Sequence, residues 1–106
     1  MVVESAEEEY FLLEQQLRNV LLQKEALKLQ ISEIEAALNE LSQYKEENTY
    51  KVVGNVMVKK RKEEVEKELK EMKEDMQIKI VSLENIEKDL VEKIRKIEER
   101  LKERGG

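Results

Sequence analysis

The stretch NTYKVVGNVMVKK, residues 48–60, decides the fold because it combines β-branched runs with a turn signal. Two such runs, 49–53 and 56–60, flank the dipeptide Gly54–Asn55. A two-residue Gly-X loop favours a type II′ turn in which the glycine takes a positive φ. We therefore predict one β-hairpin at about 49–60. The turn sets its register, which pairs Val53 with Val56, Val52 with Met57 and Lys51 with Val58.

Apolar residues on both sides of this hairpin recur with the 3.5-residue period of a left-handed coiled coil. The first helix is predicted at about 4–45 and the second at about 62–104. The expected seam of the first helix is Leu13, Leu17, Val20, Lys24, Leu27, Ile31, Ile34, Leu38 and Leu41. The expected seam of the second helix is Val65, Leu69, Met72, Met76, Lys79, Leu83, Ile86, Leu90, Ile94, Ile97 and Leu101. The expected seam advances by four residues from Ile86 to Leu90 and again by four from Leu90 to Ile94. This break in the repeat predicts a stutter that locally unwinds the supercoil near Leu90–Ile94.

Both seams are satisfied at once if the chain folds back about its middle. Leu41 then meets Val65, and Leu17 meets Leu90. The seam lysines Lys24 and Lys79 fall within one turn of each other, where a polar break can fix the register. Alternatively, Ile80 replaces Lys79 and Lys24 lays its stem over the seam. The predicted fold class is mainly α: a long antiparallel two-helix coiled coil joined by one β-hairpin, with residues 1–106 as a single unit.

Composition supports this fold and excludes several functions. The chain is 42% charged and 4% aromatic, and it has no Pro, Trp, Cys or His, which is typical of a coiled coil. Without Cys or His there is no thiol nucleophile, imidazole base or zinc finger. The sequence also lacks a P-loop. We therefore expect no enzyme activity, no cofactor and no metal.

Charge and hydropathy narrow the expected partners. The net charge of −5 disfavours nucleic acid and anionic membrane as partners. The basic run at 58–62 straddles a strand end and a helix start, so a nucleic-acid motif is disfavoured there. No apolar run approaches the roughly 20 residues that span a bilayer, and the acidic N-terminus is unlike a signal peptide. The expectation is a soluble, cytoplasmic protein.

The predicted hairpin is apolar on both faces, which is unusual for an isolated element. A lone two-stranded hairpin is marginal in water, and unpaired strand edges invite pairing with another chain. Hairpins from several copies would therefore join edge to edge into an intersubunit sheet or β-barrel. The residues expected to build this assembly are Tyr50, Val52, Val53, Gly54, Val56, Met57 and Val58.

The same segment carries a family resemblance. The pattern Tyr50, Lys51, Gly54 and Val58, followed by a helix opening at 62–63, resembles the β-class subunits of archaeal prefoldin (GimC). The resemblance implies an assembly of two α-class and four β-class subunits. It also implies an ATP-independent chaperone that holds unfolded protein clients between coiled-coil tips and passes them to a group II chaperonin.

Apolar residues beyond the seam mark the helix ends far from the hairpin as a binding surface. Exposed apolar groups there could hold unfolded chains weakly and at many points. The candidate residues are Phe11, Leu12, Leu13, Leu17, Leu21, Leu22, Ile94, Ile97 and Leu101. The alternative is that the seam members among them only close the coiled coil, while Phe11 and Leu12 are disordered or pack in a neighbouring chain.

An acidic cluster lies at the same end of the first helix and consists of Glu4, Glu7, Glu8 and Glu9. The resemblance implies that it docks on a basic surface of the chaperonin. The alternative is a first turn stabilised by the helix dipole. For the whole chain, the competing function is a structural coiled-coil scaffold that oligomerises without binding clients.

Overall fold

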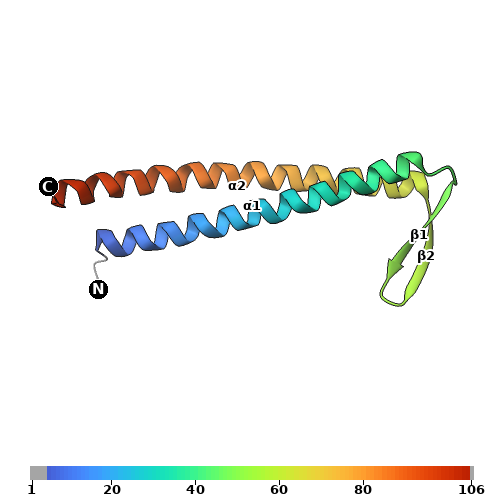
Figure 1. Ribbon diagram of the computed structural model, residues 1–106, viewed down its shortest axis with the longest axis horizontal. Coiled ribbons are helices and arrows are strands. Elements are labelled where there is room, and N and C mark those ends of the chain that lie inside the picture. Colours follow the sequence, from blue (N-terminus) through green and yellow to red (C-terminus); the bar gives the residue numbers. More distant parts are fainter. Residues whose placement is uncertain (1–4, 106) are drawn as a thin grey trace. The chain divides into compact units, whose positions relative to one another are not determined.

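The computed structural model describes residues 5–105 and contains two long helices joined by a two-stranded hairpin (Figure 1). Helix α1 spans Ala6–Gln43, strand β1 Asn48–Val53, strand β2 Val56–Arg61 and helix α2 Lys62–Gly105. The predicted fold class is confirmed. The expected start of the first helix, near residue 4, lies outside the described residues.

Helix α1 begins with a side-chain cap. The Ser5 hydroxyl oxygen accepts a hydrogen bond from the Glu8 backbone N–H at 3.1 Å, and the Ser5 carbonyl accepts one from the Glu9 N–H at 3.0 Å. Ser followed three residues later by Glu is the sequence signature of a capped helix start. Such a cap satisfies an N–H group that would otherwise have no partner in the first turn.

The chain divides into two compact parts. We call residues up to 26 together with 79 onward the terminal part, and residues 27–78 the hairpin part. Each part contains one segment of α1 and one of α2 in antiparallel pairing. In the terminal part Lys24 contacts Glu87, and in the hairpin part Glu35 contacts Lys73. These contacts agree with the predicted antiparallel register.

The predicted seam of α1 is confirmed along its length, since each of its members is buried or half-buried. Val20 and Ile34 are the most enclosed of them. The seam also extends toward the start of the helix through Tyr10 and Ala6, which keep the alternation of four- and three-residue steps. A strict heptad pattern of this kind holds one face of a helix toward its partner.

The α2 seam differs from the prediction. Met72, Lys79 and Ile86 were expected in the seam, but all three are exposed. The next residue along the chain is half-buried in each case: Lys73, Ile80 and Glu87. The alternative in which Ile80 replaces Lys79 and Lys24 covers the seam with its stem is therefore the correct one.

This shift moves the stutter. The half-buried positions run Val65, Leu69, Lys73 and Met76, so the two consecutive steps of four lie at 65–73. The predicted stutter at Leu90–Ile94 is wrong, because a regular alternation of steps continues through both of these buried residues. The break in the repeat thus lies just after the hairpin.

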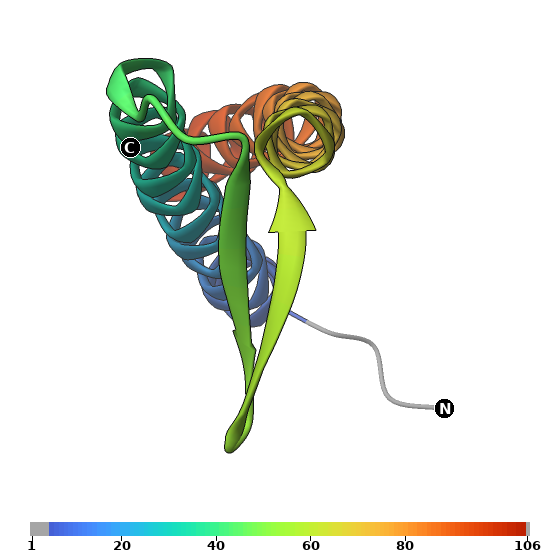
Figure 2. The same ribbon diagram turned by 90° about the vertical axis from the view of Figure 1, so that its right-hand side faces the viewer.

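The hairpin has the predicted register. Val53 pairs with Val56, Val52 with Met57, and Lys51 with Val58 in an antiparallel pair of strands, which Figure 2 shows side by side. Gly54 has a φ of +59°. Asn55, like every other described residue that is not a glycine, has no positive φ. A positive φ at the first turn position alone is the pattern of a type II′ turn.

Candidate functional site

The hairpin exposes its apolar side chains on both faces. The six apolar members of the predicted assembly surface are 43–69% exposed: Tyr50, Val52, Val53, Val56, Met57 and Val58. The seventh member, Gly54, is the turn glycine, and no atom lies within 4 Å of where a Cβ would stand. The structure therefore presents these residues together, on one short β-ribbon with two free edges.

Polar contacts fix the base of this hairpin to the adjoining helices. The Lys60 ammonium on β2 donates to the Glu68 carboxylate on α2 at 2.5 Å, and this hydrogen bond lowers the pKa of Glu68. The Lys62 N–H donates to the Glu47 carbonyl at 2.7 Å. The Lys62 ammonium donates to the carbonyl of Tyr44, also at 2.7 Å. The base of the hairpin is therefore fixed by hydrogen bonds, while the apolar side chains of its strands remain exposed.

The terminal part separates the predicted binding residues into two groups. Phe11, Leu12, Leu21 and Leu22 are exposed on α1. Leu13, Leu17 and Leu101 are half-buried in the seam, and Ile94 and Ile97 are buried there. The residues of the first group are 40–62% exposed, while those of the second group lie between the two helices.

Shallow hollows lie beside these exposed residues. One is formed by a single face of α1 and is lined by Glu7, Glu8, Phe11 and Leu12. Another lies between the helices of the terminal part, lined by Tyr10, Glu14, Leu17, Arg18, Leu21, Ile94 and Glu98. The hydrogen bond from Tyr10 to the Glu14 carboxylate raises the pKa of the phenol. Both hollows combine apolar side chains with glutamates, and the second also contains Arg18.

The predicted acidic cluster occupies the first turn of α1. Glu7, Glu8 and Glu9 are exposed there, and Glu4 lies outside the described residues. Carboxylates beside a helix N-terminus interact favourably with its dipole.

Two half-buried lysines of the seam, Lys24 and Lys73, make cross-helix ion pairs. The Lys24 side chain is only 12% exposed, and its ammonium lies 2.6 Å from Glu87 and 3.9 Å from Glu84. The hydrogen bond with Glu87 is the main cause that raises the pKa of Lys24. In the hairpin part, Lys73 lies 3.4 Å from Glu35. The seam therefore contains ionic contacts that the apolar repeat did not reveal.

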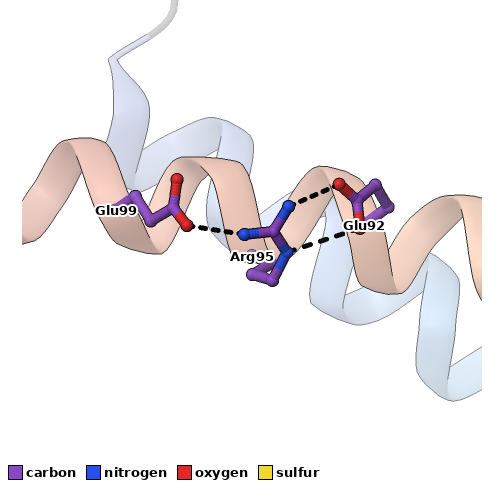
Figure 3. Close-up of polar contacts among 3 residues, drawn as sticks. All are labelled: Glu92, Arg95 and Glu99. Atoms are coloured by element: carbon purple, nitrogen blue, oxygen red, sulfur yellow. Dashed lines mark hydrogen bonds and ion pairs between the residues drawn. The ribbon is translucent and has the colours of Figure 1, made fainter.

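The outer face of α2 carries an exposed ionic cluster (Figure 3). The Arg95 guanidinium donates to Glu92 and Glu99, with closest N–O distances of 2.6 Å to each. Arg95 holds the pKa of Glu92 below its ordinary value. Exposed pairs like these support helicity by a few tenths of a kcal/mol each, so this cluster is structural.

Among residues 5–105, no group of three or more acidic, His or Cys side chains is placed to hold a metal ion. A polar hollow at the hairpin base is lined by mixed charges from 45–48 and from the start of α2. One of these charges, Lys62, lies 3.8 Å from Glu66. Within the described residues, no helix is long and apolar enough to cross a membrane.

Comparison with known proteins identifies the family. Residues 6–106 match the family described as "Prefoldin subunit". A prefoldin subunit beta of Archaeoglobus fulgidus is 39% identical over 90 residues, which cover 84% of this chain and 78% of that protein. A prefoldin subunit beta of Thermococcus onnurineus is 35% identical over 89 residues, covering 83% and 77% respectively.

Comparison with solved structures gives the same fold. The crystal structure of the prefoldin beta subunit from Thermococcus strain KS-1 matches with a TM-score of 0.84 and 30% identity, covering 92% of this chain and 87% of that one. The beta2 subunit of the same strain shares the fold, with a TM-score of 0.73 at 20% identity, covering 83% and 95%. The chain therefore belongs to the prefoldin subunit family, whose members are subunits of a chaperone.

Proposed function

We propose that this chain is a β-class prefoldin subunit that acts in the cytoplasm as an ATP-independent holdase. It binds non-native proteins through exposed apolar side chains of the terminal part and passes them to a group II chaperonin. One observation carries the proposal: Phe11, Leu12, Leu21 and Leu22 are exposed although the seam beside them is already filled by other residues. Apolar surface left in water in this way marks a binding surface.

Such binding needs no nucleotide. Unfolded chains expose scattered apolar side chains, and contacts with several leucine and phenylalanine side chains hold them by burial of apolar area. Each contact is weak, so a client remains able to leave. The buried Ile94 and Ile97 support this surface from behind by joining α2 to α1 in the terminal part.

The hairpin would supply the assembly. Its bare strands are suited to edge-to-edge pairing with hairpins of an α-class subunit and of further copies of this chain. We propose that the joined hairpins form an intersubunit β-barrel in a hexamer of two α-class and four β-class subunits. Assembly would raise the local concentration of binding surfaces, so weak contacts add up to useful avidity.

Transfer to the chaperonin would use the acidic first turn of α1. Glu7, Glu8 and Glu9 are exposed beside the apolar residues Phe11 and Leu12. Complementary charges steer encounter and set orientation more than they add affinity. A basic chaperonin surface would therefore dock close to a held client.

The binding surface is tested by comparing L22S with L29S in an aggregation assay. Both leucines lie on α1 and are 62% exposed, but Leu22 belongs to the terminal part and Leu29 to the hairpin part. We expect L22S to need roughly fivefold more chaperone for half-maximal suppression, because about 1 kcal/mol or more of apolar burial is lost. L29S serves as the matched control and should suppress aggregation like the parent protein.

Light scattering of a chemically denatured substrate, diluted into the assembled protein with its α-class partner, gives the measurement. Equal losses for L22S and L29S would contradict a surface confined to the terminal part. A parent assembly that does not suppress aggregation at all would favour the scaffold function instead.

A further inference from the structure

Helix α2 carries two overlapping apolar stripes in the terminal part. Leu83 and Leu90 belong to both stripes. Between them either Ile86 or Glu87 fits an alternation of three- and four-residue steps, and the seam of the structure takes Glu87. Ile86 is left 48% exposed. The observed stripe brings Ile80 into the seam and the other stripe would bring Ile86, so apolar burial alone does not choose between them.

The ion pair with Lys24 explains which stripe lies in the seam. The Lys24 ammonium lies 2.6 Å from the Glu87 carboxylate, and the Glu87 side chain is only 29% exposed. A half-buried lysine needs a partner of opposite charge. Glu84 lies farther away, at 3.9 Å. Glu87 is therefore the group that satisfies Lys24, and meeting it requires α2 to turn Ile86 outward.

The hairpin part shows the same arrangement independently. There the heptad spacing selects Met72, but Lys73 occupies the seam and lies 3.4 Å from Glu35. Met72 is left 47% exposed. In both parts, a seam residue that makes a cross-helix ion pair displaces the apolar residue that precedes it in the chain.

We infer that Lys24 is a positioning residue that selects which of the two stripes of α2 lies in the seam of the terminal part. With its ion pair intact, Glu87 is held inward and Ile86 faces outward. The alternative needs α2 to turn about its axis by about half a residue step, roughly 50°. That turn would exchange Glu87 for Ile86 and Ile80 for Lys79.

Loss of the ammonium should drive this exchange. Without Lys24, the carboxylate of Glu87 would be half-buried with its closest partner gone, and water would become its better environment. Ile86 could then enter the seam while Ile80 leaves it. Lys79 would tolerate the exchange because a lysine can lay its stem over the seam and keep its ammonium in water. The inference does not depend on what the protein binds.

The absence of cysteine from the chain allows single thiols to report this rotation. The variants I86C and I80C make the same side-chain change at an exposed and a half-buried site. Each is labelled with a maleimide in the full chain, with and without K24M. We expect K24M to slow labelling of I86C by about tenfold, because the form in which residue 86 is exposed would fall to about a tenth of the population. The same variant should speed labelling of I80C.

Opposite changes at the two sites distinguish rotation from loss of structure. K93M is the matched control, because Lys93 is an exposed lysine of α2 that pairs with Asp89 within the same helix; it should change neither rate. The charge-swapped variant K24E/E87K should restore the parent rates, whereas K24E alone should not. Unchanged rates in K24M, faster labelling at both sites, or failure of the swap to restore the rates would each overturn the inference.

Discussion

Lys60 and Glu68 connect the strand that leaves the hairpin to the helix that follows it. Their 2.5 Å hydrogen bond spans eight residues of sequence, so it constrains how β2 enters α2. The Lys60 side chain is 25% exposed and that of Glu68 is 45% exposed. In this partly hydrated setting the contact contributes modestly to stability, and it lowers the pKa of the Glu68 carboxyl.

The pKa of Glu68 should depend on Lys60. Since the hydrogen bond lowers this pKa, K60M should raise it toward the ordinary glutamate value of about 4.3. The contact stabilises the fold at pH values above the unfolded-state pKa, and this stabilisation is lost as the pH falls through the lowered folded-state pKa. An NMR titration of the Glu68 side-chain carboxyl measures the change.

K67M provides the control for that titration. It removes an adjacent lysine of α2 that is exposed and is not among the groups that lower the pKa of Glu68. The Glu68 pKa should therefore stay at its parent value in K67M. A pKa that does not rise in K60M would show that the ion pair does not persist in solution.

Single residues also mark where the sequence pattern stops being informative. The apolar repeat predicts every seam position of α1 from Leu13 to Leu41, because each alternative neighbour there is more polar or breaks the step. In α2 the repeat offers Met72 or Lys73, and Ile86 or Glu87. Choosing the charged residue requires knowing that Glu35 and Lys24 lie opposite. Counted forward from Val65 the regular repeat selects the apolar residues, and counted back from Leu101 it selects the charged ones, so the spacing along α2 leaves both open.

Among the elements, the hairpin is the most completely encoded by local sequence. A Gly-X dipeptide between two β-branched runs determines the turn, and the turn determines the register. The contacts at its base were not predictable in this way, because Lys60 and Lys62 reach partners outside the strands. The cap of α1 was readable from Ser5 and Glu8, the two defining residues of a capping box.

The first turn of α1 is the element in which stability and docking can be separated. The variant E7Q/E8Q/E9Q removes three negative charges from the first turn of α1. Because these charges interact favourably with the helix dipole, a small loss of thermal stability is expected. If this turn docks on the chaperonin, binding to a group II chaperonin should also weaken by roughly tenfold at low salt, where charge complementarity acts most strongly. Surface plasmon resonance and thermal denaturation measure the two effects.

The triple variant E71Q/E74Q/D75N makes the same change in charge on α2 within the hairpin part, at positions that are also exposed. It should leave chaperonin binding intact. Equal weakening by both triple variants would indicate a general effect of net charge. Stability loss without weaker binding would leave the acidic turn with only its role at the helix start.

At the scale of the whole molecule, the burial of the helices and that of the hairpin differ. The seam encloses Val20, Ile34, Leu90, Ile94 and Ile97 within one chain. The hairpin has no such cover on its apolar strands, and two strands alone bury too little to be stable in water. The coiled coil is therefore completed within the chain, whereas the outer edges of the two described strands have no strand partner.

Charges placed in the hairpin should break the assembly. V53D and V56D alter the one cross-strand pair next to the turn, where an aspartate would carry an unpaired charge into a sheet formed between subunits. We expect size-exclusion chromatography with light scattering to show smaller species for both variants. N55D adds the same charge within the turn, outside both strands, and should keep the parent mass.

Because the seams lie within each chain, circular dichroism should show that V53D and V56D retain their helices. A lower assembly mass with helicity retained would identify the hairpin as the contact between subunits. A parent mass in both variants would remove the hairpin from that role.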